Sequence, residues 1–315
     1  MGDCKIGLAL GGGSARGWAH IGVLRALNNA GIYPDIIAGT SIGAVVGGCY
    51  VAGELDALER FARELTRRKV LGFLDFNFTG TGIIHGQRLC DVLDERMKGV
   101  AIEALSKRFV AVATEIGTGH EIWLSRGRLV DAMRASYALP GIFRPVRIDG
   151  RWLFDGALVN PVPVSVCRAL GARYVIAVNV NTDSGRGTVV PHMEALPYEE
   201  QPAQPEANVI ARNGRAVKKL LQRQLFGRAD NGPGISRVMV EAFNIVQDRI
   251  ARSRLAGDPP DIIIQPRMPA FGLFDFHRAE ALIECGITAA KRDLEDIKRE
   301  IADRRSVRLV PAHMA

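Results

Sequence analysis

The sequence has few cysteines, and none of them is arranged for a metal site or a disulfide framework. Its five cysteines lie far apart, and no Cys-x-x-Cys motif is present: Cys4, Cys49, Cys90, Cys167 and Cys285. Closely spaced cysteines are the usual mark of zinc sites and of disulfide-rich secreted domains. Neither is predicted here, and reduced thiols favour a cytoplasmic location.

Long apolar runs are missing too. No stretch approaches the roughly 18 uninterrupted apolar residues that a membrane-spanning helix needs. The first residues, Met1-Gly2-Asp3-Cys4-Lys5, lead directly into a strand-like segment, so no secretory signal is predicted. A myristoylation motif would need Ser or Thr at the sixth residue, where Ile6 stands. Any membrane contact is therefore expected to be peripheral.

The net charge is small for the length of the chain. Lys and Arg number 41 against 34 Asp and Glu, which gives +7 over 315 residues, and the basic residues are mostly spread along the chain. This charge leaves a membrane surface and nucleic acid both open as anionic partners. A hydrophobic content of 47% is ordinary for a globular protein. The length suits one large α/β domain or two smaller domains.

Short apolar segments alternate with helical patterns along most of the chain. Strands are predicted at residues 5–10, 35–38, 108–114, 121–125, 174–180 and 261–265, and helices at 18–29, 44–53, 56–68, 86–97, 129–135, 163–171 and 277–305. Asp149-Gly150 is a strong hairpin signal between residues 146–148 and 152–154. Strands that alternate with helices predict a three-layer α/β fold, in which helices cover both faces of a mostly parallel central sheet.

The composition changes at Asn181. Residues up to about 208 are rich in Pro, Gly and Glu, which is typical of a long surface loop, and helices are predicted after it at 209–226 and 235–255. The first of these helices has a basic face opposite an aliphatic one, so it fits a membrane interface or packing on the domain equally well. We expect a single domain over residues 1–315, with an insertion at about 181–260 that could act as a cap.

A tight turn that exposes a serine is predicted at Gly39-Thr40-Ser41-Ile42-Gly43. It follows the strand at 35–38 and leads into the small-residue helix at 44–53. A strand, Gly-x-Ser-x-Gly and a helix together describe a nucleophile elbow, in which the two glycines relieve the crowding of the turn. The amide end of the helix would direct its partial positive charge at Ser41, the expected nucleophile.

A glycine-rich loop, Gly11-Gly12-Gly13-Ser14-Ala15-Arg16-Gly17, follows the first strand. A dinucleotide fingerprint would need glycine at position 16, and no Gly-Lys-Ser/Thr of a P-loop is present, so nucleotide binding is disfavoured. Unencumbered loop amides suit an oxyanion hole instead, because they can point at a developing negative charge. Arg16 would steady this loop or add positive potential, unless it is a solvated surface arginine.

A serine nucleophile needs a proton acceptor, and no histidine is an obvious one. His277 follows both Ser41 and Asp155 in the sequence but opens a helix, and His20 fits a structural role equally well. Asp155 ends the hairpin, and Gly156 lets the backbone turn closely there. Partial desolvation would raise the pKa of Asp155 and make its carboxylate a base that takes the serine proton directly. Asp-Gly is also an ordinary turn pair, so the residues alone leave both interpretations open.

Four segments resemble, in order, the motif blocks of the patatin-like phospholipases. They are Leu10–Gly17 (LGGGSARG), Gly39–Gly43 (GTSIG), Ala135–Pro140 (ASYALP) and Asp155–Ala157 (DGA). The resemblance is nearest to the bacterial stand-alone members and to the catalytic domain of neuropathy target esterase. It spans about residues 5–180 and returns at 261–295. One departure is Ser14, where the family usually has a glycine; if position 14 needs a positive φ, serine is strained there.

The resemblance implies a serine lipid acyl hydrolase of the phospholipase A or lysophospholipase type, with a Ser–Asp dyad, an acyl-enzyme and no cofactor or metal. It assigns the following roles: nucleophile, Ser41; base, Asp155; oxyanion hole, the amides of Gly12, Gly13 and Ser14, with support from Arg16. The implied partner is a phospholipid or lysophospholipid and not a nucleic acid, and no oligomeric state is predicted. Two rival interpretations are a Ser–His–Asp carboxylesterase and a non-catalytic, lipid-sensing regulatory protein.

Overall fold

The structure, a computed structural model, describes residues 4–73, 93–97, 99–181, 235–268, 271–272 and 274–306. The chain divides into two units, residues 1–182 with 244–315, and residues 183–243, of which only 235–243 are described. The predicted loop up to residue 208 and the basic helix at 209–226 lie outside the described residues. A single domain with an insertion at 181–260 stays a prediction.

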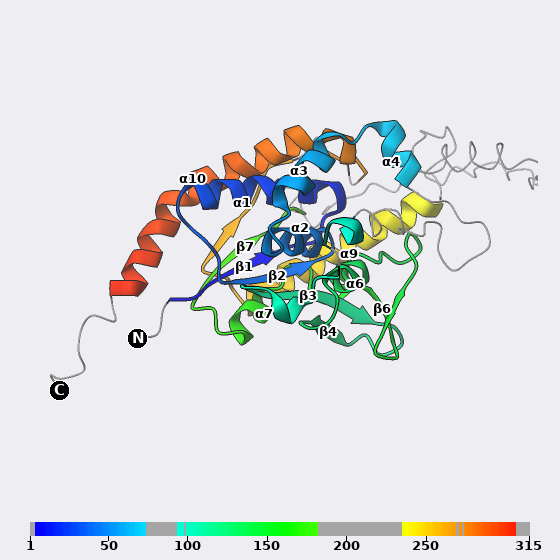
Figure 1. The fold of residues 1–315 in the computed structure, drawn as a ribbon, viewed down its shortest axis with the longest axis horizontal. Coiled ribbons are helices and arrows are strands. Elements are labelled where there is room, and N and C mark those ends of the chain that lie inside the picture. The colour runs from blue at the N-terminus through cyan, green and yellow to red at the C-terminus, as the bar shows by residue number, and fades with distance from the viewer. Residues whose placement is uncertain are drawn as a thin grey trace, which may run out of the picture. The chain divides into compact units, whose positions relative to one another are not determined.

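Eight strands form one sheet within the described residues (Figure 1). They are β1 (Ile6–Leu10), β2 (Ile36–Thr40), β3 (Arg108–Glu115), β4 (Glu121–Leu124), β5 (Val146–Ile148), β6 (Arg151–Asp155), β7 (Tyr174–Val178) and β8 (Ile262–Ile264). The order is β5-β6-β3-β2-β1-β7-β8, and β4 also pairs with β3. The pairs among β3, β2, β1, β7 and β8 are parallel, and the pairs that involve β4, β5 or β6 are antiparallel. The predicted mostly parallel sheet is confirmed.

Helices cover both faces of this sheet, and the alternation of side chains along the strands explains why. Leu8 and Leu10 of β1 join one apolar cluster, and Ala9 between them joins the other, because successive side chains of a strand point to opposite faces. The first cluster includes residues of α1 (Ala19–Asn29), α2 (Ile42–Val51), α6 (Leu129–Ser136) and α10 (Ala279–Ser306); the second includes residues of α7 (Val164–Ala169) and α9 (Ile235–Gly257). In Figure 1, α1, α2 and α10 lie above β1 and β2, and α7 lies below these two strands. The predicted three-layer α/β fold is confirmed.

The helix predicted at residues 56–68 is wrong in its extent. The chain forms two helices there, α3 (Leu55–Arg63) and α4 (Arg67–Phe73). The hydroxyl oxygen of Thr66 accepts a hydrogen bond from the amide of Lys69 at 3.2 Å. This contact is an N-cap, which starts a new helix at Arg67 instead of continuing the first one.

The Asp149-Gly150 hairpin forms as predicted. Both central residues have positive φ, 47° at Asp149 and 80° at Gly150, as a type I′ turn requires. The turn joins β5 to β6 in the register that pairs Ile148 with Arg151. It therefore fixes where β6 ends, which is at Asp155.

Two glycines let α1 and α10 approach each other closely. A methyl group at Gly22 would overlap the carbonyl oxygen of Ile283, and one at Gly286 would overlap the carbonyl oxygen of Ala19. Only glycine allows two helix backbones to come this near to each other. The contact joins the helix that follows the glycine loop to the last helix of the chain.

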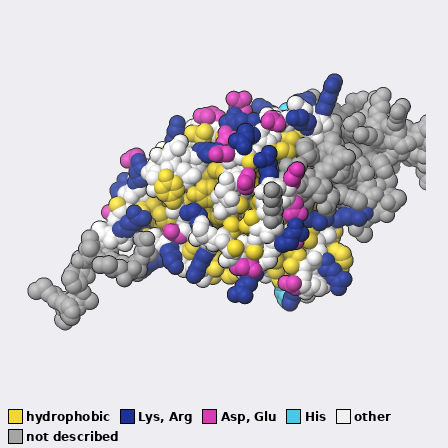
Figure 2. All heavy atoms as spheres, viewed as in Figure 1, with side chains coloured by type: hydrophobic (Ala, Val, Ile, Leu, Met, Phe, Trp, Pro, Cys, Tyr) yellow, Lys and Arg dark blue, Asp and Glu magenta, His cyan; other side chains and the backbone are white. Residues whose placement is uncertain are grey.

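Charged side chains of both signs are dispersed among hydrophobic ones on the face shown in Figure 2. Several arginines on the surface are paired with carboxylates, among them Arg25 with Glu59 at 2.9 Å and Arg304 with Asp261 at 2.6 Å. The absence of a nucleic-acid partner stays a prediction.

Candidate active site

The two predicted catalytic side chains lie where two strands end beside β3. The strand β2 pairs with β3 as far as Thr40, opposite Val112, and β6 ends at Asp155, opposite Ala113. Because β4 pairs with residues 111–114 along the other edge of β3, β2 and β6 share one edge and meet end to end. Neighbouring positions of β3 thus bring together side chains that are 114 residues apart in the sequence.

The turn after β2 holds Ser41 in an unusual backbone conformation. Its φ is 56° and its ψ is −126°. A non-glycine residue held in such a region costs on the order of 1–3 kcal/mol, and such residues cluster at functional sites. A methyl group at Gly43 would overlap the carbonyl oxygen of Leu10, and one at Gly39 would lie 2.5 Å from Cα of Ala44. The two glycines are therefore needed for the backbone to pass this closely, as in a nucleophile elbow.

Ser41 and Asp155 are directly hydrogen-bonded. The hydroxyl of Ser41 donates to Oδ2 of Asp155 at 2.6 Å, and both side chains are buried, with exposed fractions of 8% and 1%. The other carboxylate oxygen of Asp155 accepts from the amide of Ala157 at 2.9 Å. Its main chain is also fixed, because Thr114 donates to its carbonyl oxygen at 2.9 Å. The carboxylate therefore has one oxygen held by the backbone and the other facing the serine.

The pKa of Asp155 is raised from 3.8 to about 7. Burial is the main cause, because a carboxylate removed from water loses its hydration. The hydrogen bonds from Ser41 and Ala157 act in the opposite direction but are the smaller effect. A carboxylate with a pKa near neutrality is a stronger base than an ordinary aspartate, so it can accept a serine proton.

Ser136 supports the elbow, and sequence reasoning assigned it no role. Its hydroxyl donates to the carbonyl oxygen of Val112 at 2.6 Å and accepts from the amide of Ser41 at 2.9 Å. It thus satisfies a β3 carbonyl and the amide of Ser41 at the point where β2 leaves the sheet. A buried serine at the end of a helix carries little local signal for such a role.

A chain of hydrogen bonds connects the elbow to α9. Thr40 donates to the carbonyl of Asn160 at 2.8 Å, and the side-chain amide of Asn160 donates to Glu121 at 2.8 Å. Arg254 of α9 pairs with the same Glu121 at 2.6 Å and donates to the carbonyl of Val159 at 3.1 Å. These contacts fix the position of α9 relative to the segment that follows Asp155.

The glycine loop passes close to Ser41. A Cβ built at Gly12 would lie 3.4 Å from Cβ of Ser41 and 3.3 Å from Cβ of Ala157. The amide of Gly12 already donates to the carbonyl of Pro161 at 3.0 Å, whereas no hydrogen bond from the amides of Gly13 or Ser14 is found among the described residues. In this structure the Gly12 amide is thus bonded to the protein, and its predicted role as an oxyanion donor stays a prediction. Gly12 contributes by lacking a side chain.

Ser14 and Arg16 lie in the second half of the glycine loop and determine its conformation there. Ser14 has a φ of 50°, so the strain considered for a serine at this position is present. The guanidinium Nε of Arg16 donates to the carbonyl of Phe271 at 3.0 Å, and the indole of Trp18 donates to the carbonyl of Phe276 at 3.2 Å. Arg16 therefore holds the loop against the segment before α10, which is the steadying role considered for it.

No histidine contacts the dyad in the part of the chain that the structure describes. His277 accepts a hydrogen bond from Arg67 at 3.1 Å on the surface. His20 is fully buried and donates through Nε2 to the carbonyl of Gly11 at 2.8 Å, and burial lowers its pKa to about 4. His120 lies 3.5 Å from Glu115, and 70% of its side chain is exposed. The three remaining histidines lie outside the described residues: His85, His192 and His313.

Metal-binding and membrane-spanning features were sought in the same residues. No group of three or more His, Cys, Asp or Glu side chains there could hold a metal ion. Cys4, Cys49, Cys167 and Cys285 are free thiols. No helix in the described ranges is long and apolar enough to cross a membrane.

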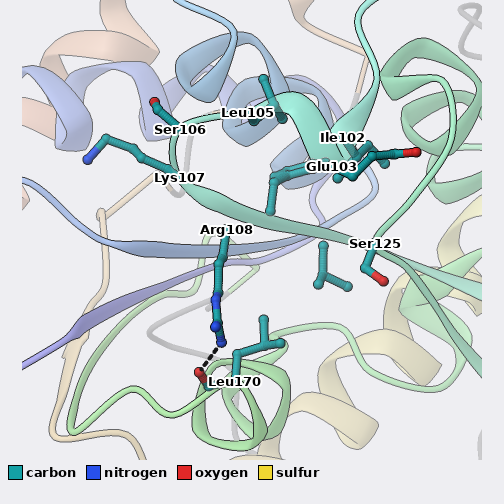
Figure 3. A pocket seen from close by; sticks show the side chains of 10 residues that line it. Ile102, Glu103, Leu105, Ser106, Lys107, Arg108, Ser125 and Leu170 are labelled. Atoms are coloured by element: carbon teal, nitrogen blue, oxygen red, sulfur yellow. Dashed lines mark hydrogen bonds between the residues drawn. The ribbon is translucent and has the colours of Figure 1, made fainter.

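A hollow of about 230 Å³ lies at the amino end of β3, away from the dyad (Figure 3). From Arg108, which lines it, to Ala113 beside the dyad, the strand rises roughly 16 Å. The charged groups around the hollow are bonded to the protein itself: Arg108 donates to the carbonyl of Leu170 at 3.1 Å, and Lys107 donates to the carbonyl of Pro34 at 2.6 Å. These contacts are structural, and we assign no ligand to this hollow.

Known proteins resemble this chain in sequence and in fold. The family model described as patatin-like phospholipase matches residues 8–168, which include Ser41 and Asp155. An uncharacterised NTE family protein of Mycobacterium tuberculosis, Rv1063c, is 34% identical over 92% of this chain and 91% of its own length. Lysophospholipase NTE1 of Coccidioides immitis is 28% identical over 94% of this chain but 18% of its own length. Among solved structures, VipD from Legionella pneumophila has a TM-score of 0.51 at 13% identity, covering 94% of this chain and 67% of VipD, which shows a likeness of fold alone.

Proposed function

This chain belongs to the patatin-like phospholipase family, and from that premise we propose that it is a serine lipid acyl hydrolase. Its substrates are the carboxylic esters of phospholipids or lysophospholipids, and its catalytic groups are Ser41 and Asp155. The observation that carries this proposal is the 2.6 Å hydrogen bond between the Ser41 hydroxyl and a buried carboxylate. The family membership supports the substrate class, and the name of the fungal relative is that of a lysophospholipase.

The first half of the reaction forms an acyl-enzyme. The Oγ of Ser41 attacks the ester carbonyl carbon while its proton moves to Oδ2 of Asp155. The negative charge that develops on the carbonyl oxygen is stabilised by the amides of Gly13 and Ser14 and by the amide end of α2. The bond from the carbonyl carbon to the alcohol oxygen then breaks, and Asp155 returns the proton to the departing alcohol.

The second half of the reaction releases the fatty acid. A water molecule gives a proton to Asp155 and attacks the acyl carbon, and the bond to Ser41 breaks with return of that proton to Oγ. The products are the alcohol and the carboxylic acid, and the enzyme is regenerated. Each step uses only side chains and amides of this chain, so no cofactor is part of the proposal. We further propose that the protein is cytoplasmic and reaches its lipid substrate by peripheral contact with a membrane surface.

The proposal is tested by removing each dyad group. The Ser41→Ala variant should lose hydrolysis of a lysophospholipid by roughly 10³-fold or more and should lose labelling by a fluorophosphonate. The Asp155→Asn variant should show nearly the same loss of turnover, because an amide cannot accept the proton. Mass spectrometry of the labelled wild-type protein should place the adduct on the peptide that contains Ser41. Wild-type turnover in Ser41→Ala would end the proposal.

The two rival interpretations predict different results. A Ser–His–Asp esterase should lose activity when one particular histidine is replaced by Gln, whereas a Ser–Asp dyad keeps its activity in all six single variants. A non-catalytic lipid-sensing protein should form no adduct with the fluorophosphonate although it is folded. The direct contact between Ser41 and Asp155 favours the dyad.

A further inference from the structure

A glutamine of α9, Gln247, lies beside the glycine loop with its side chain almost completely buried. Its exposed fraction is 2%, although glutamine is usually a surface residue. The side-chain oxygen Oε1 accepts a hydrogen bond from Nδ2 of Asn181 at 2.6 Å. Asn181 is held in turn, because its amide donates to the side-chain oxygen of Asn179 at 3.1 Å. Because Oε1 must accept the hydrogen bond from Asn181, the orientation of the Gln247 amide is fixed.

The nitrogen of this amide faces the nucleophile's side of the glycine loop. A Cβ built at Gly12 would lie 3.0 Å from Nε2 of Gln247 and 3.4 Å from Cβ of Ser41, so both groups border the same small space. No hydrogen bond from Nε2 is found within the described part of the chain. The N–H groups of Nε2 are therefore left to donate to a group other than the described protein atoms, such as an atom of a bound substrate.

The side of α9 that carries Gln247 is packed on the sheet. Ala251, four residues on, is 1% exposed and belongs to the apolar cluster of that face, and Arg254 is bonded to Glu121 and to the carbonyl of Val159. Residues three and four apart share a face of a helix, so these contacts orient Gln247 as well. Val246, on another side of the helix, is 44% exposed.

We propose that Nε2 of Gln247 is a side-chain donor of the oxyanion hole, which acts with the amides of Gly13 and Ser14. The inference rests on the proposed function, because it needs an ester that reacts at Ser41. The Gly12 amide is bonded to Pro161, and the Gln247 amide is a donor that borders Gly12 on the side where Ser41 lies. Glutamine and asparagine amides are established donors to developing oxyanions, and they act without reorganisation when their orientation is fixed beforehand. Asn181 is then a positioning residue.

The test compares Gln247→Met with the wild type on two substrates, a short-chain ester and a lysophospholipid. Methionine keeps the length and the apolar stem but cannot donate a hydrogen bond. We expect kcat to fall by roughly 10- to 100-fold for both esters with KM within about twofold, because the interaction forms in the transition state. Gln247→Glu, of nearly the same shape, should lose more, since it places acceptors or a negative charge beside the oxyanion. Val246→Thr, on the adjacent exposed position, is the matched control and should keep wild-type kcat.

Three results would overturn the inference. They are a kcat of Gln247→Met within about twofold of the wild type, a loss confined to the lysophospholipid, and a raised KM at unchanged kcat. Should Gln247→Met fail to fold, as judged by thermal unfolding, the same comparison with Gln247→Glu decides. If the wild type itself hydrolyses neither ester, the proposed function fails; if it hydrolyses both and Gln247→Met does so equally, only the role of Gln247 fails.

Discussion

Ionisation of Asp155 costs free energy because the carboxyl is buried, and in the proposed mechanism this cost makes the carboxylate a stronger base. Its carboxyl is 1% exposed, and burial raises its pKa to about 7. Because this folded-state pKa lies above the ordinary value of 3.8, the ionised side chain destabilises the fold progressively as the pH rises from 3.8 towards 7. A more exposed aspartate would ionise without this cost, but it would be a weaker acceptor for the proton of Ser41.

The activity should follow the ionisation of this one carboxyl. Only deprotonated Asp155 can take the serine proton, so kcat/KM should rise with pH and level off above an apparent pKa of about 7. The measurement is release of fatty acid from a lysophospholipid between pH 5 and 9, with pH-dependent unfolding checked separately. A profile that is flat from pH 5 to 8 would show that the carboxyl is not the base.

Single residues also differ in how visible their roles are in the sequence. The turn at Ser41 could be predicted because its signal is local, with a strand before it and a small-residue helix after it. Asp155 could be placed only by its hairpin and its resemblance to a family motif, since Asp-Gly pairs are common in turns. Ser136 and Gln247 could not be predicted, because a lone polar residue within a helical pattern does not reveal which backbone or loop it will face.

At the scale of elements, the site depends on how β1, β2 and α2 pass one another. The first turn of α2 lies against the end of β1, where Gly43 allows contact with the carbonyl of Leu10. The position of the glycine loop, which leaves β1 at this point, is thereby coupled to the position of Ser41. The elbow and the glycine loop, with its proposed oxyanion donors, form one packed unit for this reason.

The Gly43→Ala variant should test this coupling. The added methyl group overlaps backbone and not a movable side chain, so we expect a loss of roughly 2–4 kcal/mol in the free energy of unfolding, together with a large fall in kcat. Gly257→Ala is the matched control, because a Cβ there meets no atom within 4 Å. Urea unfolding measures both variants. Equal stability of Gly43→Ala and the wild type would refute the proposed close contact.

Most strands and helices can be predicted from the hydrophobic periodicity of the sequence, but the pairing of the strands cannot. The strand ranges at 108–114 and 121–125 agree closely with β3 and β4. The edge of β3 that pairs with β2, and the position along that edge where β6 begins to pair, depend on contacts between distant segments. No local pattern in the sequence encodes these contacts. The helix break at Thr66 was missed because the amphipathic pattern continues across it, and only the capping hydroxyl marks the boundary.

At the scale of the whole molecule, the last helix supports a site to which it contributes no catalytic group. Its glycine contact with α1 and the bonds from Arg16 and Trp18 to residues 271 and 276 hold the glycine loop from the C-terminal side. The loop is thus held between β1 on one side and the segment before α10 on the other. A substitution that shifts α10 should therefore also shift the glycine loop.

The Gly286→Ala variant should show whether α10 supports the glycine loop or contributes only to the stability of the fold. Its methyl group would overlap the carbonyl of Ala19, so we expect about 2–4 kcal/mol of lost stability and a measurable fall in the rate of fluorophosphonate labelling at Ser41. Glu284→Ala, at an exposed position of the same helix, should change neither quantity. Thermal unfolding and labelling kinetics give the two readouts. A destabilised Gly286→Ala protein that labels at the wild-type rate below its unfolding transition would contradict the link to the loop.

The distance of 114 residues between the two dyad members has a consequence for a newly made chain on the ribosome. At ordinary elongation rates, roughly ten seconds separate synthesis of the serine from synthesis of its aspartate. During that interval the hydroxyl has no base, and it gains one only when the second half of the hairpin has joined the sheet. On the proposed mechanism, the nascent polypeptide therefore has no esterase activity before Asp155 has been made and β6 has joined the sheet.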